Sequence, residues 1–408
     1  MAVRQVDFGR KEFRSDPYPL WEELRHAGPV HREVSGGWLV VTHAAAEQLL
    51  RDPRTGKDLR LLNDGSDPGV PSSASQRYMD LWTECRLPSI HRQWRRLVQP
   101  GFTPKAVASL REPMRRIAED LLDAAPADGS FDLMTGFART FPVAAVASVL
   151  GLDSPGTQTL LQWSDAIGAV LEPGVDAGTQ AIGDAAFDAL ADCIIGGISR
   201  RRRQPADDFL TGLIAGADET LTDQQLVATI MLLFLSGIET SAALVGNGVL
   251  ALSDAPEQAD LLRTRPELMP SAIEEILRFD GPACIVVRAT YEPVRVDGVQ
   301  VPAGELLLFA LGSANRDPAR FHDPDRLVLD RRPNRHLAFG TGDHHCAGTG
   351  LARMEATVAM EALIARFPLL EVDKEAVRWM DSQYLRGPAY LPVMTHSMMP
   401  SGEGKKCR

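Results

Sequence analysis

The most constraining feature of the sequence is a glycine-rich segment, His336 to Glu355, that holds a single cysteine. Cys346 follows two glycines, Gly340 and Gly342, and precedes a helical stretch. Glycine adopts the backbone angles of tight turns that other residues avoid. A cysteine just before a helix N-terminus is stabilised as a thiolate by the helix dipole and by free N–H groups. The segment therefore predicts a thiolate ligand for a soft metal.

Two other interpretations of this segment remain open from the residues alone. The first is a structural loop with a buried cysteine. The second is a zinc site that uses His344, His345 and Cys346. Zinc ligands usually come in separated pairs such as Cys-x-x-Cys, and the sequence contains no such pair. The spacing therefore disfavours zinc.

Composition excludes several classes of function. The chain has 408 residues, 43 basic and 54 acidic, with a formal net charge of −11, which argues against nonspecific nucleic-acid binding. Its longest apolar run, Leu226 to Leu235, soon reaches Glu239 and is too short to span a bilayer. The N-terminus lacks the apolar core of a signal peptide, and the five scattered cysteines form no disulfide framework. We expect a cytoplasmic protein without a membrane or nucleic-acid partner.

Hydrophobic periodicity predicts a mainly helical chain. It favours a helix over 16–27, a hairpin that turns at Gly36-Gly37, and an irregular stretch over 55–88. Helices dominate from Ile90 to about Phe367. Short strands are expected at 285–288, 294–296, 305–309 and 384–393. We expect one domain over residues 1–400 and a disordered tail over 401–408.

The longest expected helix runs from Thr222 to about Ser253, roughly 45 Å. Thr222 and Gln225 form a capping box at its start. Its middle carries the polar motif SGIETS, residues 236–241, inside an apolar rod. A threonine hydroxyl can bond the carbonyl four residues back and loosen a helix, so a groove is expected here. We expect Ser236 to bond the carbonyl of Leu232.

These motifs resemble the cytochrome P450 family. The cysteine segment matches the family's signature Phe-Gly-x-Gly-x-His-x-Cys-x-Gly at every fixed position, from Phe339 to Gly348. The long helix matches Ala/Gly-Gly-x-Asp/Glu-Thr-Thr/Ser, with Ser236 in place of the usual Ala or Gly. DPYPLWEELRHAGPV and RGPAYLPV resemble soluble bacterial members that tailor secondary metabolites. The resemblance implies a large helical domain with small β-sheets, and haem between the long helix and the cysteine loop.

The resemblance also implies roles for single residues. Cys346 would be the axial ligand of the iron in haem b, iron protoporphyrin IX. Glu239 and Thr240 would be the catalytic acid and alcohol that relay protons to bound dioxygen. Gly237, Phe339 and Gly340 would lie against the cofactor. Its propionates, as buried carboxylates, need donor partners, which would be His91, Arg95, Arg288 and His344, with His336 a further candidate.

Two further sets follow from the same resemblance. Glu275 and Arg278 lie at i and i+3 on one helix face, where an ion pair can form. With Arg331 they would have a structural role around the cofactor. The mostly apolar substrate pocket would be lined by the stretches 60–88 and 163–180 and by Leu232, Leu233, Leu235, Ser236, Ala283, Cys284, Val287, Tyr384 and Leu385.

The activity that the resemblance implies is that of a haem-thiolate monooxygenase. It would insert one oxygen atom from O2 into a hydrophobic small molecule, such as a polyketide, peptide or terpenoid of antibiotic biosynthesis. Electrons would come from a ferredoxin and an NAD(P)H-dependent ferredoxin reductase. An acidic electron carrier could bind the chain at Arg92, Arg95 and Arg96. A substrate tethered to an acyl or peptidyl carrier protein, and an oxidative coupling reaction, are alternatives.

Glu239 and Thr240 also bear on two other classes of haem protein. A sensor that binds haem without oxygenating needs no proton relay, so Glu239 and Thr240 argue against it. Peroxide-driven members of the family typically carry Arg and Pro in place of this acid–alcohol pair, and that replacement is absent here.

Overall fold

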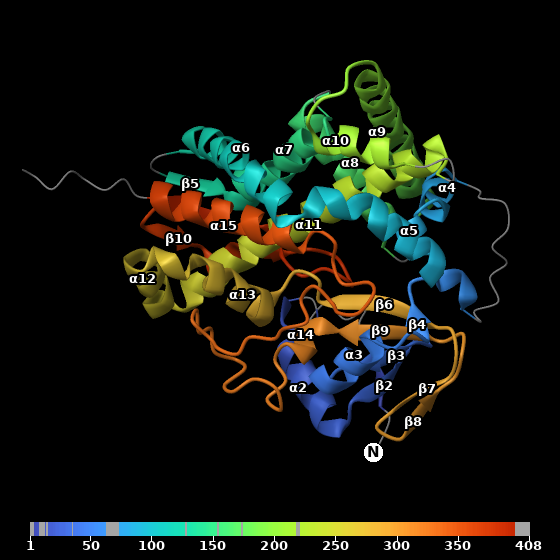
Figure 1. The fold of residues 1–408 in the computed structure, drawn as a ribbon. Coiled ribbons are helices and arrows are strands. Elements are labelled where there is room, and N and C mark those ends of the chain that lie inside the picture. Colours follow the sequence, from blue (N-terminus) through green and yellow to red (C-terminus); the bar gives the residue numbers. More distant parts are fainter. Residues whose placement is uncertain are drawn as a thin grey trace, which may run out of the picture.

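The computed structural model describes residues 4–7, 13, 15–34, 36–62, 73–126, 129–152, 155–172, 174–217 and 221–395. The expected tail at 401–408 and part of the irregular stretch at 55–88 lie outside the described residues. Helices form the larger part of the molecule, and a sheet built from both halves of the sequence packs on one side (Figure 1). The single domain expected over 1–400 stays a prediction.

The helices follow the predicted periodicity, with boundaries shifted by one or two residues at most of the expected ends. The described helices are α2 (Tyr18–Ala27), α3 (His43–Leu50), α4 (Ala74–Asp80), α5 (Pro88–Val98), α6 (Pro104–Asp123), α7 (Thr140–Val149), α8 (Thr157–Val170), α9 (Ala177–Arg203), α10 (Phe209–Gly216), α11 (Asp223–Asp254), α12 (Pro256–Thr264), α13 (Met269–Asp280), α14 (Leu311–Ala314) and α15 (Thr349–Arg366).

The largest sheet has six strands in the order β1 (Gln5–Val6), β2 (Val30–Glu33), β3 (Trp38–Val40), β9 (Leu306–Ala310), β6 (Ile285–Thr290) and β4 (Thr55–Gly56). The predicted hairpin is confirmed, since β2 and β3 pair antiparallel. The smaller sheets pair β10 (Leu370–Val372) and β5 (Gly129–Asp132) with β13 (Pro392–Thr395), β11 (Arg378–Trp379) with β12 (Pro388–Tyr390), and β7 (Val294–Val296) with β8 (Val299–Val301).

The core helix α11 is buried at both ends of its span and more open in its middle. The capping box at its start is confirmed, because Thr222 and Gln225 bond each other's backbone N–H groups. Residues 226–231 and 241–252 are buried, whereas Ser236 between them is exposed. By length and composition α11 could cross a membrane, but 61% of its most apolar window is buried inside the structure. It therefore packs as a core helix.

A buried carboxylate fastens the irregular chain after α14 to α13. The Glu275 and Arg278 side chains are both 0% exposed and form the ion pair that their spacing allows, with two N–O distances of 2.8 Å. Arg331 donates from Nε to both oxygens of Glu275, at 3.0 and 3.1 Å. Removing one partner of such a buried pair typically costs about 3–5 kcal/mol. The cluster thus fixes the chain that leads into the cysteine loop.

Candidate functional site

The cysteine loop presents its thiol just before a helix. Gly340 and Gly342 have φ angles of 66° and 76°, in the left-handed region that glycine allows. The backbone N–H of Cys346 donates to the carbonyl of Phe339 at 3.0 Å, and α15 begins at Thr349. The side chain of Cys346 is exposed. The interpretation as a structural loop with a buried cysteine is therefore wrong.

Contact with α3 holds this loop in place. A Cβ on Gly342 would lie 2.4 Å from the carbonyl oxygen of Leu50, so only glycine fits at this close approach. Thr349 donates from its hydroxyl to the carbonyl of Cys346 at 2.7 Å, which joins the loop to the first turn of α15. Both ends of the loop are thus anchored, and the exposed thiol has a fixed backbone.

The zinc alternative finds no support in the described part of the chain. There, the metal-binding side chains whose ligand atoms converge are Glu84, His91 and His344, and neither His345 nor Cys346 belongs to that group. The ring of His345 instead lies against Phe339, with centroids 6.4 Å apart. The ligand atoms of His344, His345 and Cys346, the disfavoured zinc alternative, are not grouped together in the described residues.

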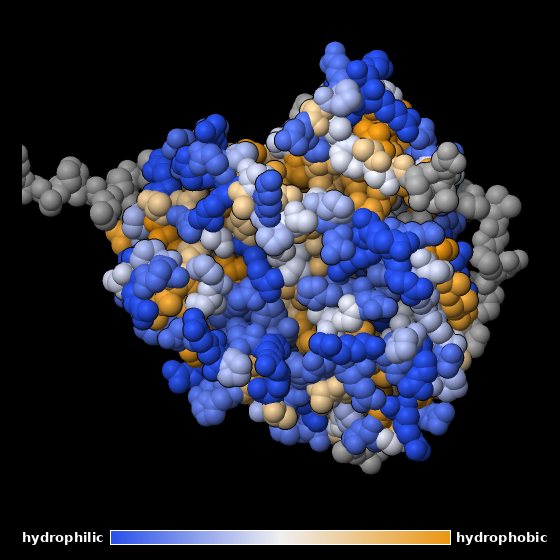
Figure 2. Space-filling model, viewed as in Figure 1, coloured by the Kyte–Doolittle hydropathy of each residue, from blue (hydrophilic) through white to orange (hydrophobic). Residues whose placement is uncertain are grey.

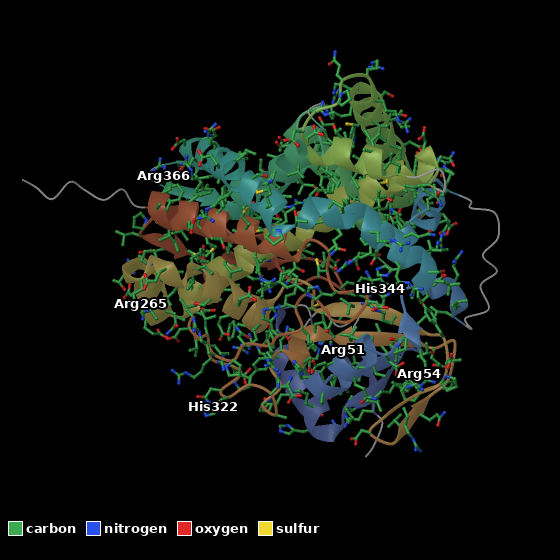
Figure 3. All side chains as sticks on the ribbon, viewed as in Figure 1. Arg51, Arg54, Arg265, His322, His344 and Arg366 are labelled. Atoms are coloured by element: carbon green, nitrogen blue, oxygen red, sulfur yellow. The ribbon has the colours of Figure 1, made fainter. Side chains whose placement is uncertain are left out.

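Two of the expected propionate ligands face each other across the site. His91, on the buried face of α5, lies 4.1 Å from His344 between ring centroids, and His344 lies between α5 and the sheet that carries β6 (Figure 3). Nε2 of His91 and Nδ1 of His344 are buried without a hydrogen-bond partner in the structure as described. Burial lowers the pKa of both imidazoles, that of His91 to about 4.

Arg288 adds a buried charge to the same site. It is 3% exposed, and burial lowers the pKa of its guanidinium. Its Nη1 donates to the carbonyl of Val287 at 2.7 Å, and among the described residues no carboxylate forms an ion pair with it. Arg95 on α5 is half-buried and likewise has no ion-pair partner there. A buried guanidinium beside unpartnered imidazoles fits a group that carries carboxylates, as haem does.

The further candidate His336 is engaged elsewhere. Its Nε2 lies 3.2 Å from Oε2 of Glu274, and Arg353 binds the same carboxylate at 2.8 Å. This places His336 in a cluster between α13 and α15. It is not among the converging side chains of Glu84, His91 and His344.

The polar motif of α11 bonds to its own helix. Thr240 donates from Oγ1 to the carbonyl of Ser236 at 2.9 Å. Ser236 donates to the carbonyl of Leu232 at 2.7 Å, as predicted. The helix nevertheless continues without a break through the motif, so the expected loosening does not interrupt it. At Gly237 a Cβ would lie 3.2 Å from the side chain of Val146 on α7, so the two helices pack closely at this position.

Glu239 is held by an arginine that the sequence did not reveal. Arg139 directly precedes α7. Its Nη2 lies 3.1 Å from Oε1 of Glu239, and each of the two side chains is 20% exposed. The same Nη2 pairs with Asp165 of α8. One guanidinium therefore joins three helices at the carboxylate of α11. Arg139 carries no motif, and only the packing of α7, α8 and α11 brings it here.

A pocket of about 280 Å³ opens beside this carboxylate. Glu239, Arg139 and Leu385 line it together with Asp165 and Glu172 of the α8 region. Of the expected lining, Leu385 and part of the stretch 163–180 lie here, the latter through Ser164, Asp165, Gly168, Ala169 and Glu172. Leu232, Leu233 and Leu235 instead pack on a separate core cluster around Phe187 and Phe234. Ser236 is exposed on α11.

The expected residues of β6 and of the chain after β11 lie side by side. Ala283 forms a β-bridge with Leu385, and the backbone N–H of Cys284 donates to the carbonyl of Tyr384 at 3.0 Å. Cys284 is buried with half-buried Val287 and Tyr384 around it, and burial raises the pKa of its thiol to about 12. The two segments expected to line the pocket are therefore adjacent, but Cys284 is buried in a core cluster.

Sequence reasoning also missed a buried carboxyl on α15. Glu355 is 2% exposed, its Oε2 accepts a hydrogen bond of 2.7 Å from Ser241 of α11, and its Oε1 has no partner in the structure as described. Burial raises the pKa of Glu355 to about 7. Ser241 follows Thr240 directly, so this carboxyl lies one residue from the expected relay. Helical periodicity places Glu355 on the inner face of α15, but nothing in its local sequence predicts a neutral acid.

Comparison with known proteins identifies the family to which the chain is similar. The family described as Cytochrome P450 matches residues 178–389. The chain is 35% identical to cytochrome P450 monooxygenase PikC of Streptomyces venezuelae over 94% of this chain and 92% of PikC. It is 30% identical to polyketide biosynthesis cytochrome P450 PksS of Bacillus subtilis (strain 168), over 94% of this chain and 96% of PksS.

Solved structures extend the likeness to the fold. The structure of PksS has a TM-score of 0.85 and covers 96% of this chain and 99% of its own, at 28% identity. P450BioI in complex with hexadec-9Z-enoic acid ligated acyl carrier protein has a TM-score of 0.87, at 27% identity, and covers 95% of this chain and 100% of its own. The mainly helical fold expected from the sequence is confirmed.

The buried acid gives a testable pH dependence. Because the pKa of Glu355 is raised in the folded chain from 4.5 to about 7, the unfolded state gains stability by ionising first as pH rises. We expect Glu355→Gln to gain about 3 kcal/mol in free energy of unfolding relative to the unmodified chain between pH 4.5 and pH 7. Urea unfolding across this range measures it, with exposed Glu361→Gln on the same helix as control. Parallel pH curves would contradict the buried acid.

Proposed function

The chain belongs to the cytochrome P450 family, and on this premise we propose that it is a haem-thiolate monooxygenase in which the thiolate of Cys346 would hold the haem iron. Its relatives make it a bacterial secondary-metabolite monooxygenase, an oxidoreductase that incorporates oxygen. The observation that carries the ligand assignment is the exposed thiol of Cys346, three residues ahead of α15 on an anchored backbone. A helix N-terminus favours the thiolate that soft metals bind.

The cofactor of the family is a haem, and we infer haem b. When bound through a thiolate, haem supplies the activation and cleavage of O2. Arg288 and His91 would bind its propionates, because their donors are buried and no carboxylate among the described residues pairs with them, and His344, which packs on His91, would join them. Arg95 would add a fourth donor from the half-buried side of α5. Phe339 and Gly340 would lie against the ring on the side of Cys346.

Glu239 and Thr240 would carry protons to the oxygen site. The hydroxyl of Thr240 holds its proton toward the carbonyl of Ser236, from which it can turn by rotation about one bond. The carboxylate of Glu239 faces a pocket of about 280 Å³ and is held there by Arg139. This arrangement supports a path in which Glu239 takes protons from the pocket and Thr240 delivers them.

The substrate would be a hydrophobic small molecule, such as a polyketide, peptide or terpenoid intermediate. Leu385, which lines the pocket beside Glu239, and Ala283, which forms a β-bridge with it, support this class. A substrate tethered to an acyl or peptidyl carrier protein is the second candidate, favoured by the likeness to P450BioI, whose structure holds an acyl carrier protein with its fatty acid. We place the reaction in the cytoplasm, in line with the bacterial relatives.

A redox partner belongs to the family's reaction, and we propose a ferredoxin with its NAD(P)H-dependent reductase. Arg92 and Arg96 are exposed on α5, and hydrophilic side chains gather over this helix (Figure 2). Arg95 lies between them. This basic face would attract an acidic carrier although the net charge of the chain is −11.

Charge attraction at this face predicts a salt dependence. We expect the rate of ferredoxin-supported turnover to fall as ionic strength rises, because salt screens attraction between exposed charges. Arg92→Gln with Arg96→Gln should flatten that dependence, and exposed Arg265→Gln, remote on the sequence, serves as control. Rates that ignore salt in the unmodified chain would exclude electrostatic docking.

The ligand assignment is tested by the spectrum of the reduced carbon monoxide complex. We expect Cys346→His to lose the absorption typical of thiolate-bound haem, because imidazole donates less electron density than thiolate. Cys193→Ser is a control, since this cysteine lies on α9. An unchanged spectrum in Cys346→His would exclude Cys346 as the ligand.

The proton path is tested by the coupling of electron use to product. We expect Thr240→Ala to release most of its reducing equivalents as hydrogen peroxide, because the delivering hydroxyl is gone. Thr240→Ser keeps a hydroxyl and should retain most of the coupling. Stoichiometry of NADPH, peroxide and product measures the effect, and tight coupling in Thr240→Ala would contradict the relay. Turnover with hydrogen peroxide alone would instead support a peroxide-driven enzyme.

A further inference from the structure

A half-buried ion pair, in which the side chain of Lys57 is 31% exposed and that of Glu84 is 11% exposed, lies beside the expected propionate ligands and has no part in the function proposed above. Glu84 precedes α5 and is 8% exposed. Its Oε1 lies 2.5 Å from Nζ of Lys57, and its Oε2 accepts a hydrogen bond of 2.9 Å from the thiol of Cys85. Burial alone would raise the pKa of Glu84, but Lys57, His344 and Cys85 hold it well below the ordinary value. Glu84 is therefore ionised.

The two partners belong to opposite sides of the site. Lys57 directly follows β4, whose Gly56 pairs with Ala289, the neighbour of Arg288 on β6. A Cβ on Gly56 would lie 2.1 Å from the hydroxyl oxygen of Tyr291, so this turn is packed tightly on the sheet. Glu84 belongs to the helical turn just ahead of α5, which carries His91. The ion pair therefore ties the sheet side to the helix side.

Glu84 also faces one edge of His344. Nδ1 of His344 lies 3.8 Å from Oε1 of Glu84, beyond hydrogen-bond distance but close enough for electrostatic attraction. The opposite edge of an imidazole carries Nε2, which is then directed away from Glu84. The ring of His91 packs on that of His344, with centroids 4.1 Å apart, and limits its rotation.

We propose that the Lys57–Glu84 pair is a clasp that positions the propionate ligands of the haem. The pair fastens the strand of Arg288 to the helix of His91. It also holds Nδ1 of His344 toward Glu84, so that Nε2 is free to bind a porphyrin carboxylate. The proposal rests on the haem site proposed above. Lys57 and Glu84 are positioning residues, because neither needs to touch the porphyrin.

The clasp needs both residues, because the positive charge of Lys57 offsets the negative charge of Glu84. An ionised Glu84 alone would repel the porphyrin carboxylates, since like charges at close range disfavour each other. Lys57 cancels that charge. Removing Lys57 alone should therefore weaken haem retention more than removing both charged groups together.

Haem transfer to an excess of apomyoglobin, followed by absorbance, tests the clasp. We expect the haem-loaded Lys57→Met chain to release haem about tenfold faster than the unmodified chain, because a buried carboxylate loses its partner. Lys57→Arg should restore the slow release. The double variant Lys57→Met with Glu84→Gln should release haem faster than the unmodified chain but more slowly than Lys57→Met alone. Lys374→Met, which breaks an exposed ion pair with Asp254, is the matched control and should release haem at the unmodified rate.

The outcomes separate this inference from the function itself. If the unmodified apoprotein takes up no haemin, the proposed haem site fails. If it takes up haemin and Lys57→Met releases it at the unmodified rate, only the clasp is overturned. Should Lys57→Met fail to fold by circular dichroism, the double variant, which leaves no unpaired charge, decides in its place. Unmodified release from that variant would likewise overturn the clasp.

Discussion

The carboxylate of Glu275 is the interaction on which the arrangement around Cys346 depends. It is fully buried, yet it accepts hydrogen bonds from two arginines, Arg278 and Arg331, and from the backbone of Val328. A buried charge is stable only when every oxygen has a donor, so these partners are fixed together. Because Arg331 lies only a few residues before the cysteine loop, the network sets where that loop starts. Contact of Gly342 with α3 then sets where it turns.

The long helix α11 packs in the hydrophobic core and also carries the motif expected to do chemistry. Its two ends are buried and hold the domain together, whereas its middle carries Ser236, Glu239 and Thr240 with partial exposure. The hydroxyls are satisfied by carbonyls of the same helix, so they can be present there without breaking it. Only Glu239 needs a partner from outside, and Arg139 provides it from the position just before α7. That dependence links the acid to α8, because Asp165 binds the same guanidinium.

Electrostatics divides the site into two kinds of buried group. Arg288 and His91 are donors without carboxylate partners among the described residues, which matches a site built for an anionic ligand. Glu84, by contrast, is an acceptor within the same cluster and forms an ion pair with Lys57. A dianionic cofactor is accommodated only if that compensation persists, since an unpaired carboxylate would oppose it. The ion pair and the donors therefore act as one electrostatic unit.

The features that could be predicted from the amino-acid sequence are local ones, formed by residues that lie close together along the chain. The glycine turns before Cys346, the capping box of α11, the pairing of Glu275 with Arg278 and the N-terminal hairpin all follow from residues a few positions apart, and the family follows from the motifs. Tertiary structure alone decided which distant groups meet. Arg139 contacts Glu239 from a hundred residues away in the sequence, and Lys57, after β4, pairs with Glu84, before α5. Cys284, which the motifs placed in the substrate pocket, is buried in a core cluster. The physical reason is that burial and charge pairing depend on how helices and strands pack, which no local pattern encodes.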